Sequence, residues 1–259
     1  MHIFGDLSVS VMEHRESASE PTPAMMQGGA ASLNSFLSQM EPRGEHVGLR
    51  AHQRFRHGNT GYDLIAVVEG ALAIEATLPN GRRQILEFLL PGDVVTMTSL
   101  LFPSLFPAVS IRAMTKASAI CLNHRAAAQC IREEYWEMLL AQTQVQLARA
   151  NAHRLMIGHL DTTSRVASFL LSFAFRTCGP GQSSLHFALP MSRDDIADYL
   201  AMNSDTLSRI MMRFEAMTLI RRLNRHEVSV DDIDALKRVT PIAHLLSTTF
   251  DRARPPLAN

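Results

Sequence analysis

The chain has 259 residues, in which 25 Lys and Arg balance 25 Asp and Glu, and 46% of the residues are hydrophobic. This length suits one or two domains with cores of their own, and the composition is that of a soluble globular protein. A net charge of zero does not indicate a nucleic-acid partner, so any basic surface must be confined to one part of the chain. No apolar run is long enough to cross a membrane, and the start lacks the features of a signal peptide. We therefore expect a cytoplasmic protein.

The first 45 residues are rich in Ser, Pro, Met and Gly, with PTPAMMQGGAAS at their centre. A segment of this composition buries too little apolar surface to offset the entropy cost of ordering. Residues 1–45 are therefore expected to be a flexible N-terminal tail. Its amphipathic end, Leu33–Met40, is the part that we expect to pack on the next domain.

Residues 46–129 alternate short β-prone runs with turn signals. The run Leu64–Val68 is apolar throughout, which indicates a strand buried on both faces. Pro79-Asn80-Gly81 and Pro91-Gly92-Asp93 are strong turn sequences. Short strands with frequent turns predict an antiparallel jelly-roll barrel.

Three histidines, His46, His52 and His57, fall close together in this segment. Their spacings of six and five do not place a pair on one helix turn, and no carboxylate or cysteine frames them. We expect solvated or hydrogen-bonded histidines and no metal site.

Residues 131–157 contain neither Gly nor Pro and predict one long helix, within a dimerisation segment at 130–157. Apolar residues form a heptad-like seam that Gln142 and Arg149 interrupt. Either the seam packs on the chain's own domain, or it pairs two copies of the chain. The seam consists of Ile131, Tyr135, Met138, Val145, Ala152 and Met156.

Residues 158–240 contain the most informative stretch, Leu189–Ile220, which predicts two short helices joined by a tight turn. Ser192 can cap the first helix together with Asp195, and Asn203 can cap the second. The second helix has an apolar side and a polar side, the layout of the recognition helix in a helix-turn-helix. The apolar side comprises Leu207, Ile210, Met211, Phe214 and Met217, and the polar side Ser204, Asp205, Ser208 and Arg209.

The polar side has the chemistry for reading bases. An arginine pairs bidentately with guanine, a carboxylate accepts from cytosine, and a hydroxyl serves either base. Polar stripes also occur on ordinary helix pairs, so a solvated helix face is the alternative interpretation.

Several motifs resemble the Crp/Fnr family of bacterial transcription regulators. The run Asp205-Thr206-Leu207-Ser208-Arg209 resembles the family's Glu-x-x-Ser-Arg recognition signature, with Asp in place of Glu. Other matching segments, in the family's order, are Val67–Gly70, Pro91-Gly92-Asp93, Arg165–Leu171, Ile196–Leu200, Arg213-Phe214-Glu215 and Leu219-Ile220.

The resemblance implies an α+β protein with a cyclic-nucleotide-binding-like barrel, a dimerisation helix and a C-terminal winged helix-turn-helix. It also implies a homodimer that binds double-stranded DNA and contacts RNA polymerase. The FixK-like branch implies an activator that binds palindromic TTGA/TCAA-like sites and controls low-oxygen or respiratory genes.

The stretch Leu219–Val230 predicts a hairpin wing with Asn224-Arg225-His226 at its turn, followed by a short closing helix at residues 231–239. Residues 241–259 are expected to be a flexible tail. Polar recognition-helix residues and wing arginines are the candidate DNA contacts. They are Ser204, Asp205, Ser208, Arg209, Arg213, Arg221, Arg222 and Arg225.

The sequence gives weaker evidence about the signal or ligand that the barrel senses. The segment after Asp93 lacks the Gly-Glu pair that cradles a cyclic phosphate in nucleotide-binding relatives, and residues 97–106 are strongly apolar. We therefore expect no cofactor. The alternative is a regulator gated by a cyclic nucleotide or haem.

Cysteine spacing argues against an iron–sulfur cluster, because residues 1–120 contain no cysteine and four thiolates are normally needed. Cys121 is expected to be buried. Cys178, in an expected exposed loop, is either a passive thiol or a redox-active one. No nucleophile–base–orienter set suggests an enzyme.

Overall fold

The structure is a computed structural model that describes residues 38–251, except 39, 57–61, 78, 97–108, 133–135 and 179–184. Most of the expected N-terminal tail and the last eight residues therefore lie outside the described part of the chain. His57 and the apolar stretch 97–106 lie outside it too. Among the described residues, no helix is long and apolar enough to cross a membrane.

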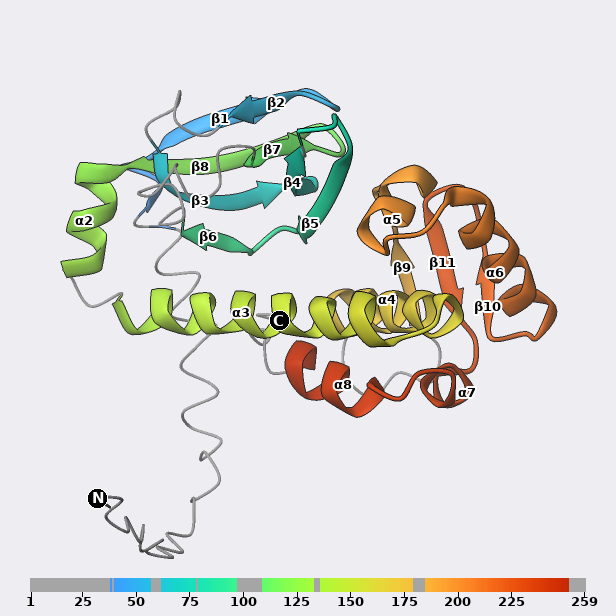
Figure 1. Cartoon of the computed structure of the whole chain (residues 1–259). Coiled ribbons are helices and arrows are strands. Elements are labelled where there is room, and N and C mark those ends of the chain that lie inside the picture. The colour runs from blue at the N-terminus through green and yellow to red at the C-terminus, as the bar shows by residue number, and fades with distance from the viewer. Residues whose placement is uncertain are drawn as a thin grey trace, which may run out of the picture.

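The N-terminal half consists of two four-stranded antiparallel sheets that face each other (Figure 1). One sheet has the strand order β1-β8-β3-β6 and the other the order β2-β7-β4-β5. This is the expected barrel. The strands are β1 Glu45–Leu49, β2 Arg54–Arg56, β3 Tyr62–Glu69, β4 Leu72–Thr77, β5 Arg83–Leu89, β6 Val94–Thr96, β7 Val109–Ala113 and β8 Ala117–Asn123.

Strand β3 is buried on both faces from Leu64 to Val67, as its apolar run predicted, although Val68 is exposed. Alternate side chains of a strand point to opposite faces. Ile65 and Val67 enter the core between the two sheets, whereas Leu64 and Ala66 enter a second core. The second core includes Ala127 and Leu139, so helices cover the outer face of this sheet.

Tight turns join the strands where glycines adopt left-handed backbone conformations. Gly70, between β3 and β4, has a φ of 77°, and a Cβ there would lie 2.3 Å from the carbonyl oxygen of Lys116. Only glycine fits such a position without strain. In the Pro91-Gly92-Asp93 turn, the carboxylate of Asp93 accepts a hydrogen bond of 2.7 Å from the backbone N–H of Leu90.

Two helices, and not one, follow the barrel. Helix α2 (His124–Arg132) lies across the direction of α3 (Trp136–His159) in Figure 1. The prediction of one helix over 131–157 is therefore wrong at its N-terminal end. The absence of Gly and Pro permits a continuous helix but does not require one, because packing of α2 against β3 and β8 redirects the chain.

The C-terminal part of the predicted seam of α3 faces the chain's own domains. Ala152 and Met156 are buried in the core of the C-terminal half, and Arg149 pairs with Asp93 at 2.8 Å. The side chains of Ile131, Tyr135 and Met138 lie outside the described part. A different apolar stripe points outward on α3, formed by Leu140, Leu147 and Leu155, which are 50%, 48% and 41% exposed.

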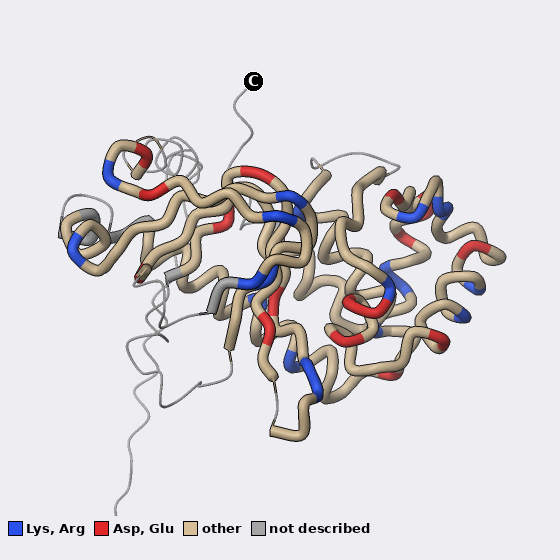
Figure 2. Tube along the Cα trace, turned by 90° about the horizontal axis from the view of Figure 1, so that it is seen from above, with Lys and Arg blue, Asp and Glu red and all other residues tan. Residues whose placement is uncertain are grey.

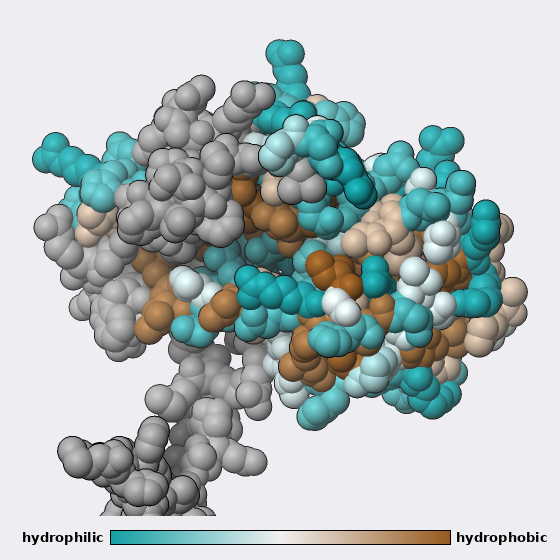
Figure 3. Space-filling model, in the orientation of Figure 1, coloured by the Kyte–Doolittle hydropathy of each residue, from teal (hydrophilic) through white to brown (hydrophobic). Residues whose placement is uncertain are grey.

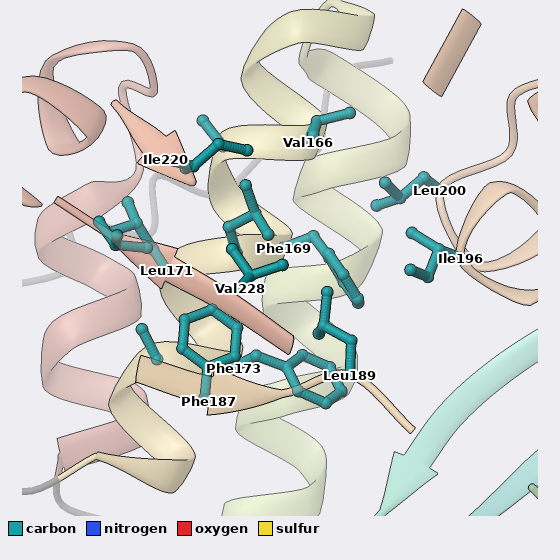
Figure 4. Packing of buried hydrophobic residues seen from close by; sticks show 14 of the residues in the cluster. Val166, Phe169, Leu171, Phe173, Phe187, Leu189, Ile196, Leu200, Ile220 and Val228 are labelled. Carbon is teal, nitrogen blue, oxygen red and sulfur yellow. The ribbon is translucent and has the colours of Figure 1, made fainter. Parts of the chain in front are cut away.

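The C-terminal half contains the predicted helix pair and hairpin. Figure 4 shows how side chains from α4, β9, α5 and the β10–β11 hairpin converge on Phe169 and Phe173. The elements are α4 Thr162–Thr177, β9 Leu185–Ala188, α5 Arg193–Tyr199, α6 Ser204–Ala216, β10 Ile220–Arg222, β11 Glu227–Val230, α7 Ile233–Arg238 and α8 Ala243–Asp251.

Helix α8 corrects the expectation of a flexible tail from residue 241. Leu246 and Phe250 of α8 are buried in the same core as α4. Brown, hydrophobic side chains are visible along α3 and around α8 in the space-filling view of Figure 3. The apolar spacing of Ile242, Leu246 and Phe250 is the signal by which the sequence indicates a helix here.

The two halves share one core. Phe88 of β5 packs edge-on against Phe169 and Phe173 of α4, with ring centroids 6.3 and 5.8 Å apart, and lies 5.0 Å from the ring of Tyr199 in α5. The barrel therefore contacts the C-terminal half directly.

Candidate nucleic-acid interface

Helix α5 begins as its sequence predicted. The Ser192 side chain accepts a hydrogen bond of 3.1 Å from the backbone N–H of Asp195, and the Asp195 carboxylate accepts one of 3.2 Å from the backbone N–H of Ser192. This reciprocal capping box satisfies two backbone donors at the helix start. It sets the position of the first helix.

The turn between α5 and α6 also has the expected form. Ala201 has a φ of 51°, which reverses the chain direction after Leu200. Asn203 then caps α6, since its side-chain oxygen accepts a hydrogen bond of 2.7 Å from the backbone N–H of Thr206. The result is a helix-turn-helix.

The inner face of α6 is buried at four of the five expected positions, Leu207, Ile210, Met211 and Phe214. The fifth, Met217, is 55% exposed and corrects the prediction. Met217 lies just beyond the last helical residue, and the chain turns at Thr218, where φ is 55°. The next apolar residues, Leu219 and Ile220, are buried instead of Met217.

The outer face of α6 presents Asp205 and Arg209 to solvent. No described residue forms an ion pair or side-chain hydrogen bond with either of them. Ser208 is half-buried, and its hydroxyl donates to the backbone oxygen of Ser204 at 2.8 Å. This face carries an unengaged guanidinium and carboxylate one turn apart.

The other candidate arginines fall into two groups. Arg213 donates to the hydroxyl of Thr163, Arg221 pairs with Asp231 at 3.3 Å, and Arg222 pairs with Glu215. The Arg222 hydrogen bond lowers the pKa of the Glu215 carboxyl. Arg225, at the wing tip, is exposed and has no such partner in the described part of the chain.

The wing is the expected hairpin. Strands β10 and β11 pair antiparallel from Ile220 opposite Val230 to Arg222 opposite Val228, and β9 extends the sheet on the other side of β11. A cleft of about 750 Å³ separates the wing from α5 and α6. Figure 2 shows acidic and basic segments interspersed along the trace, in keeping with the zero net charge.

One residue on this surface is not among the DNA contacts that the sequence predicts. Arg193, the first residue of α5, is exposed and donates to the Ser208 hydroxyl at 3.4 Å. It therefore reaches the polar face of α6. The signal available was its position directly after the N-cap, where the first helix of such a motif crosses the DNA backbone.

The two cysteines whose side chains are described differ in their surroundings. Cys121 is buried as expected, and burial raises the pKa of its thiol to about 12. Cys178 ends α4, is half-buried, and its thiol donates to the backbone oxygen of His186 at 3.3 Å. The expected exposed loop is therefore only partly exposed at Cys178, and redox activity stays a prediction.

Comparisons with known proteins agree with this architecture. Residues 164–239 match the Crp-like helix-turn-helix domain, and residues 53–134 match the cyclic nucleotide-binding domain. The chain is 34% identical over 196 residues to the nitrogen fixation regulation protein FixK of Bradyrhizobium diazoefficiens, which covers 72% of this chain and 76% of that protein. It is 31% identical over 183 residues to FixK of Rhizobium meliloti, which covers 71% of this chain and 81% of that protein.

Among solved structures, FixK2 from Bradyrhizobium japonicum matches with a TM-score of 0.64 and 25% identity over 76% of this chain and 97% of that chain. A double-sheet barrel followed by a winged helix-turn-helix defines a class of two-domain DNA-binding regulators. The chain belongs to the Crp/Fnr family of transcription regulators, and FixK proteins are among its relatives.

Proposed function

We propose that this regulator binds a palindromic TTGA/TCAA-like DNA site as a homodimer and activates transcription in low-oxygen or respiratory gene control. The observation that carries the proposal is the outer face of α6, where Asp205 and Arg209 are exposed and unengaged within the described structure. Arg209 reads the guanine of the half-site through a bidentate contact. Arg193 and Arg225 flank this face and bind phosphates.

The dimer forms through the outward stripe of α3. Leu140, Leu147 and Leu155 are spaced by seven and eight residues, so they follow one side of the helix. Exposed apolar residues in such a row favour burial against a second copy of the helix. Pairing in this way gives two recognition helices on one face of the DNA.

The contacts of Arg112 argue against a cyclic phosphate as ligand. Arg112, on β7, is the one described arginine of the segment where relatives hold the phosphate, and its guanidinium is already bound to Glu75 and Asp195 at 2.9 and 2.6 Å. We therefore propose that DNA binding does not require a cyclic nucleotide. Gating by a cyclic nucleotide or haem is the alternative.

The biological setting is proposed from the family resemblance, and the activating role from the names of relatives. FixK of Rhizobium meliloti is a nitrogen fixation regulation protein, and a relative in Stutzerimonas stutzeri is the transcriptional activator protein FnrA. We extend transcription activation to this chain, and we propose a contact with RNA polymerase from the family resemblance alone. A regulator of bacterial genes acts in the cytoplasm.

In vitro selection of DNA sequences bound by the full-length protein tests the proposal. We expect a palindrome containing TTGA and TCAA, bound without added nucleotide. Selection with and without a thiol reductant also reports whether Cys178 affects binding. Enrichment of no palindrome, or enrichment only after cAMP or haem is added, would contradict the proposal.

A further inference from the structure

Six charged side chains form an ion-pair cluster where the barrel meets α5. Three are cations and three are anions, and Glu75, Arg112 and Asp195 are buried. Helix α5 contributes two of the anions, and the barrel contributes all the other members. The cluster comprises Arg54, Glu75, Arg83 and Arg112 of the barrel and Asp195 and Asp198 of α5.

Asp195 serves the cluster and the helix start at once. Its Oδ2 atom accepts from the backbone N–H and the hydroxyl of Ser192, and its Oδ1 atom accepts from Arg83 at 2.9 Å and Arg112 at 2.6 Å. Burial alone would raise the pKa of Asp195, but the hydrogen bonds from Ser192 and Arg112 lower it below the usual value. The carboxylate is therefore ionised at neutral pH and connects the barrel to the first helix of the DNA-binding motif.

The last turn of α5 is held in the same way. Arg83 Nε donates to Asp198 Oδ2 at 2.9 Å, and the Gln84 side-chain amide donates to the backbone oxygen of Asp198 at 2.6 Å. Both ends of α5 are thus bonded to the start of strand β5. Two attachment points on one helix fix its direction as well as its position.

The apolar part of this interface cannot fix a direction as well. Phe88 packs on Phe169, Phe173 and Tyr199, and such burial is favourable but non-directional. Hydrogen-bonded arginine forks add geometric specificity, whereas buried ion pairs add little net stability. The cluster therefore contributes more to the orientation of α5 on the barrel than to the stability of the interface.

We propose that this ion-pair cluster fixes the orientation of the helix-turn-helix on the barrel and so determines the half-site spacing that the dimer accepts. Helix α6 lies on the side of α5 away from the barrel (Figure 1). The cluster therefore leaves the outer face of α6, with Asp205 and Arg209, exposed. Two recognition helices must reach half-sites about one helical turn apart. The inference rests on the proposed function, because only a dimer on a palindrome has a spacing to select.

The test uses full-length Arg83→Met, which removes the contacts to Asp195 and Asp198 and keeps an unbranched side chain in place of the aliphatic part of the arginine. Binding is measured to the selected palindrome, to the same palindrome with one base pair inserted or deleted, and to a single half-site. The wild type should prefer the selected spacing by about tenfold or more, and Arg83→Met by less than about threefold. Binding to the single half-site should stay within about twofold, since the reading face is unchanged.

The matched control is Arg82→Met, which removes the same charge from the neighbouring position. Arg82 is exposed, and its guanidinium has no ion-pair partner among the described residues. Its spacing preference should equal that of the wild type. Asp198→Ala disrupts the cluster from the α5 side and should reproduce Arg83→Met, and the double variant should lose no more than either single change.

Full spacing preference in Arg83→Met and in Asp198→Ala would overturn the inference. An equal loss in Arg82→Met would overturn it too, since general charge would then be the cause. Failure of the wild type to bind any palindrome would instead overturn the proposed function. Should Arg83→Met fail to fold, Asp198→Ala decides the question, because Asp198 is half-exposed.

Discussion

The candidate arginines differ in whether their guanidinium groups are already bound to other side chains. Arg213, Arg221 and Arg222 are engaged by Thr163, Asp231 and Glu215, whereas Arg209 and Arg225 have no partner in the described structure. An engaged guanidinium must exchange its partner for a phosphate, and this exchange cancels part of the gain. We therefore expect Arg209 and Arg225 to contribute most to DNA binding.

Arg209→Ala should cost roughly 1–3 kcal/mol on the selected palindrome and relax the preference at one guanine, because it removes a bidentate base contact. Arg225→Ala is the comparison, and it should weaken all sequences about equally and lower the salt dependence of binding. Titrations of fluorescent duplexes, with and without the guanine substitution, measure both effects. An unchanged base preference in Arg209→Ala would show that α6 does not read this guanine.

Glu87 is a second residue with a defined expected behaviour. Burial raises the pKa of its carboxyl to about 7, although Arg149 at 3.5 Å opposes the shift, and the neighbouring Asp93 adds to it. The folded protein therefore binds a proton that the unfolded chain releases between the usual glutamate pKa and about pH 7. Stability should fall as the pH rises through this window.

Glu87→Gln should remove this pH dependence and stabilise the protein at pH 8 by roughly 1–3 kcal/mol, since the amide needs no proton to be neutral. Urea unfolding of both proteins from pH 5 to pH 8 measures the difference. Parallel stability curves for the two proteins would mean that Glu87 is ionised throughout.

At the scale of elements, helix faces are assigned by what packs on them. The heptad-like seam of α3 follows from apolar spacing alone, yet Ala152 and Met156 face the chain's own core and Leu147 faces solvent. A helix with apolar residues on more than one side supports several such seams. Only the position of the barrel and of α4 shows which side stays outside.

Helix α8 gives a prediction at this scale. Leu246 is fully buried against α4, whereas Leu245, next to it in the chain, is 39% exposed. Leu246→Ala should destabilise the protein by about 2–5 kcal/mol through cavity formation. Leu245→Ala should change stability by less than about 0.5 kcal/mol. Thermal or urea unfolding compares the two, and equal effects would show that α8 does not dock.

The whole molecule is organised around a core that the barrel and the DNA-binding half share. Phe88, Phe169 and Tyr199 come from three elements far apart in the sequence and meet in one aromatic cluster. The shared core and the ion-pair cluster connect the recognition helix to the barrel and, through the proposed α3 interface, to a second copy. We therefore expect dimerisation and DNA recognition to depend on each other.

Leu147→Glu should convert the dimer to a monomer, because it places a charge in the middle of the proposed α3 interface. Affinity for the palindrome should then fall by about tenfold or more, while binding to a single half-site changes little. Sedimentation velocity measures the oligomeric state. Leu86→Glu, at another exposed leucine on β5, is the control and should remain dimeric. A dimeric Leu147→Glu protein would show that this stripe is not the interface.

Local patterns are sufficient to predict the helix-turn-helix, both of its N-caps, the wing and the doubly buried strand β3. Capping boxes, turns and apolar periodicity depend on residues within about four positions of one another, so the chain specifies them without tertiary context. The same locality explains why helical periodicity alone places Ser204, Asp205, Ser208 and Arg209 on the polar side of one helix.

Contacts between distant residues required the tertiary structure. The sequence shows Asp195 as a capping residue, but only the fold brings it to Arg83 and Arg112, which lie 112 and 83 positions away. The same is true of the outward stripe of α3 and the docking of α8, whereas the wing arginines Arg221 and Arg222 pair with acids only ten and seven positions away. Ion pairing and burial depend on which residues of another element approach a side chain. The periodicity of the sequence around that side chain does not identify those residues.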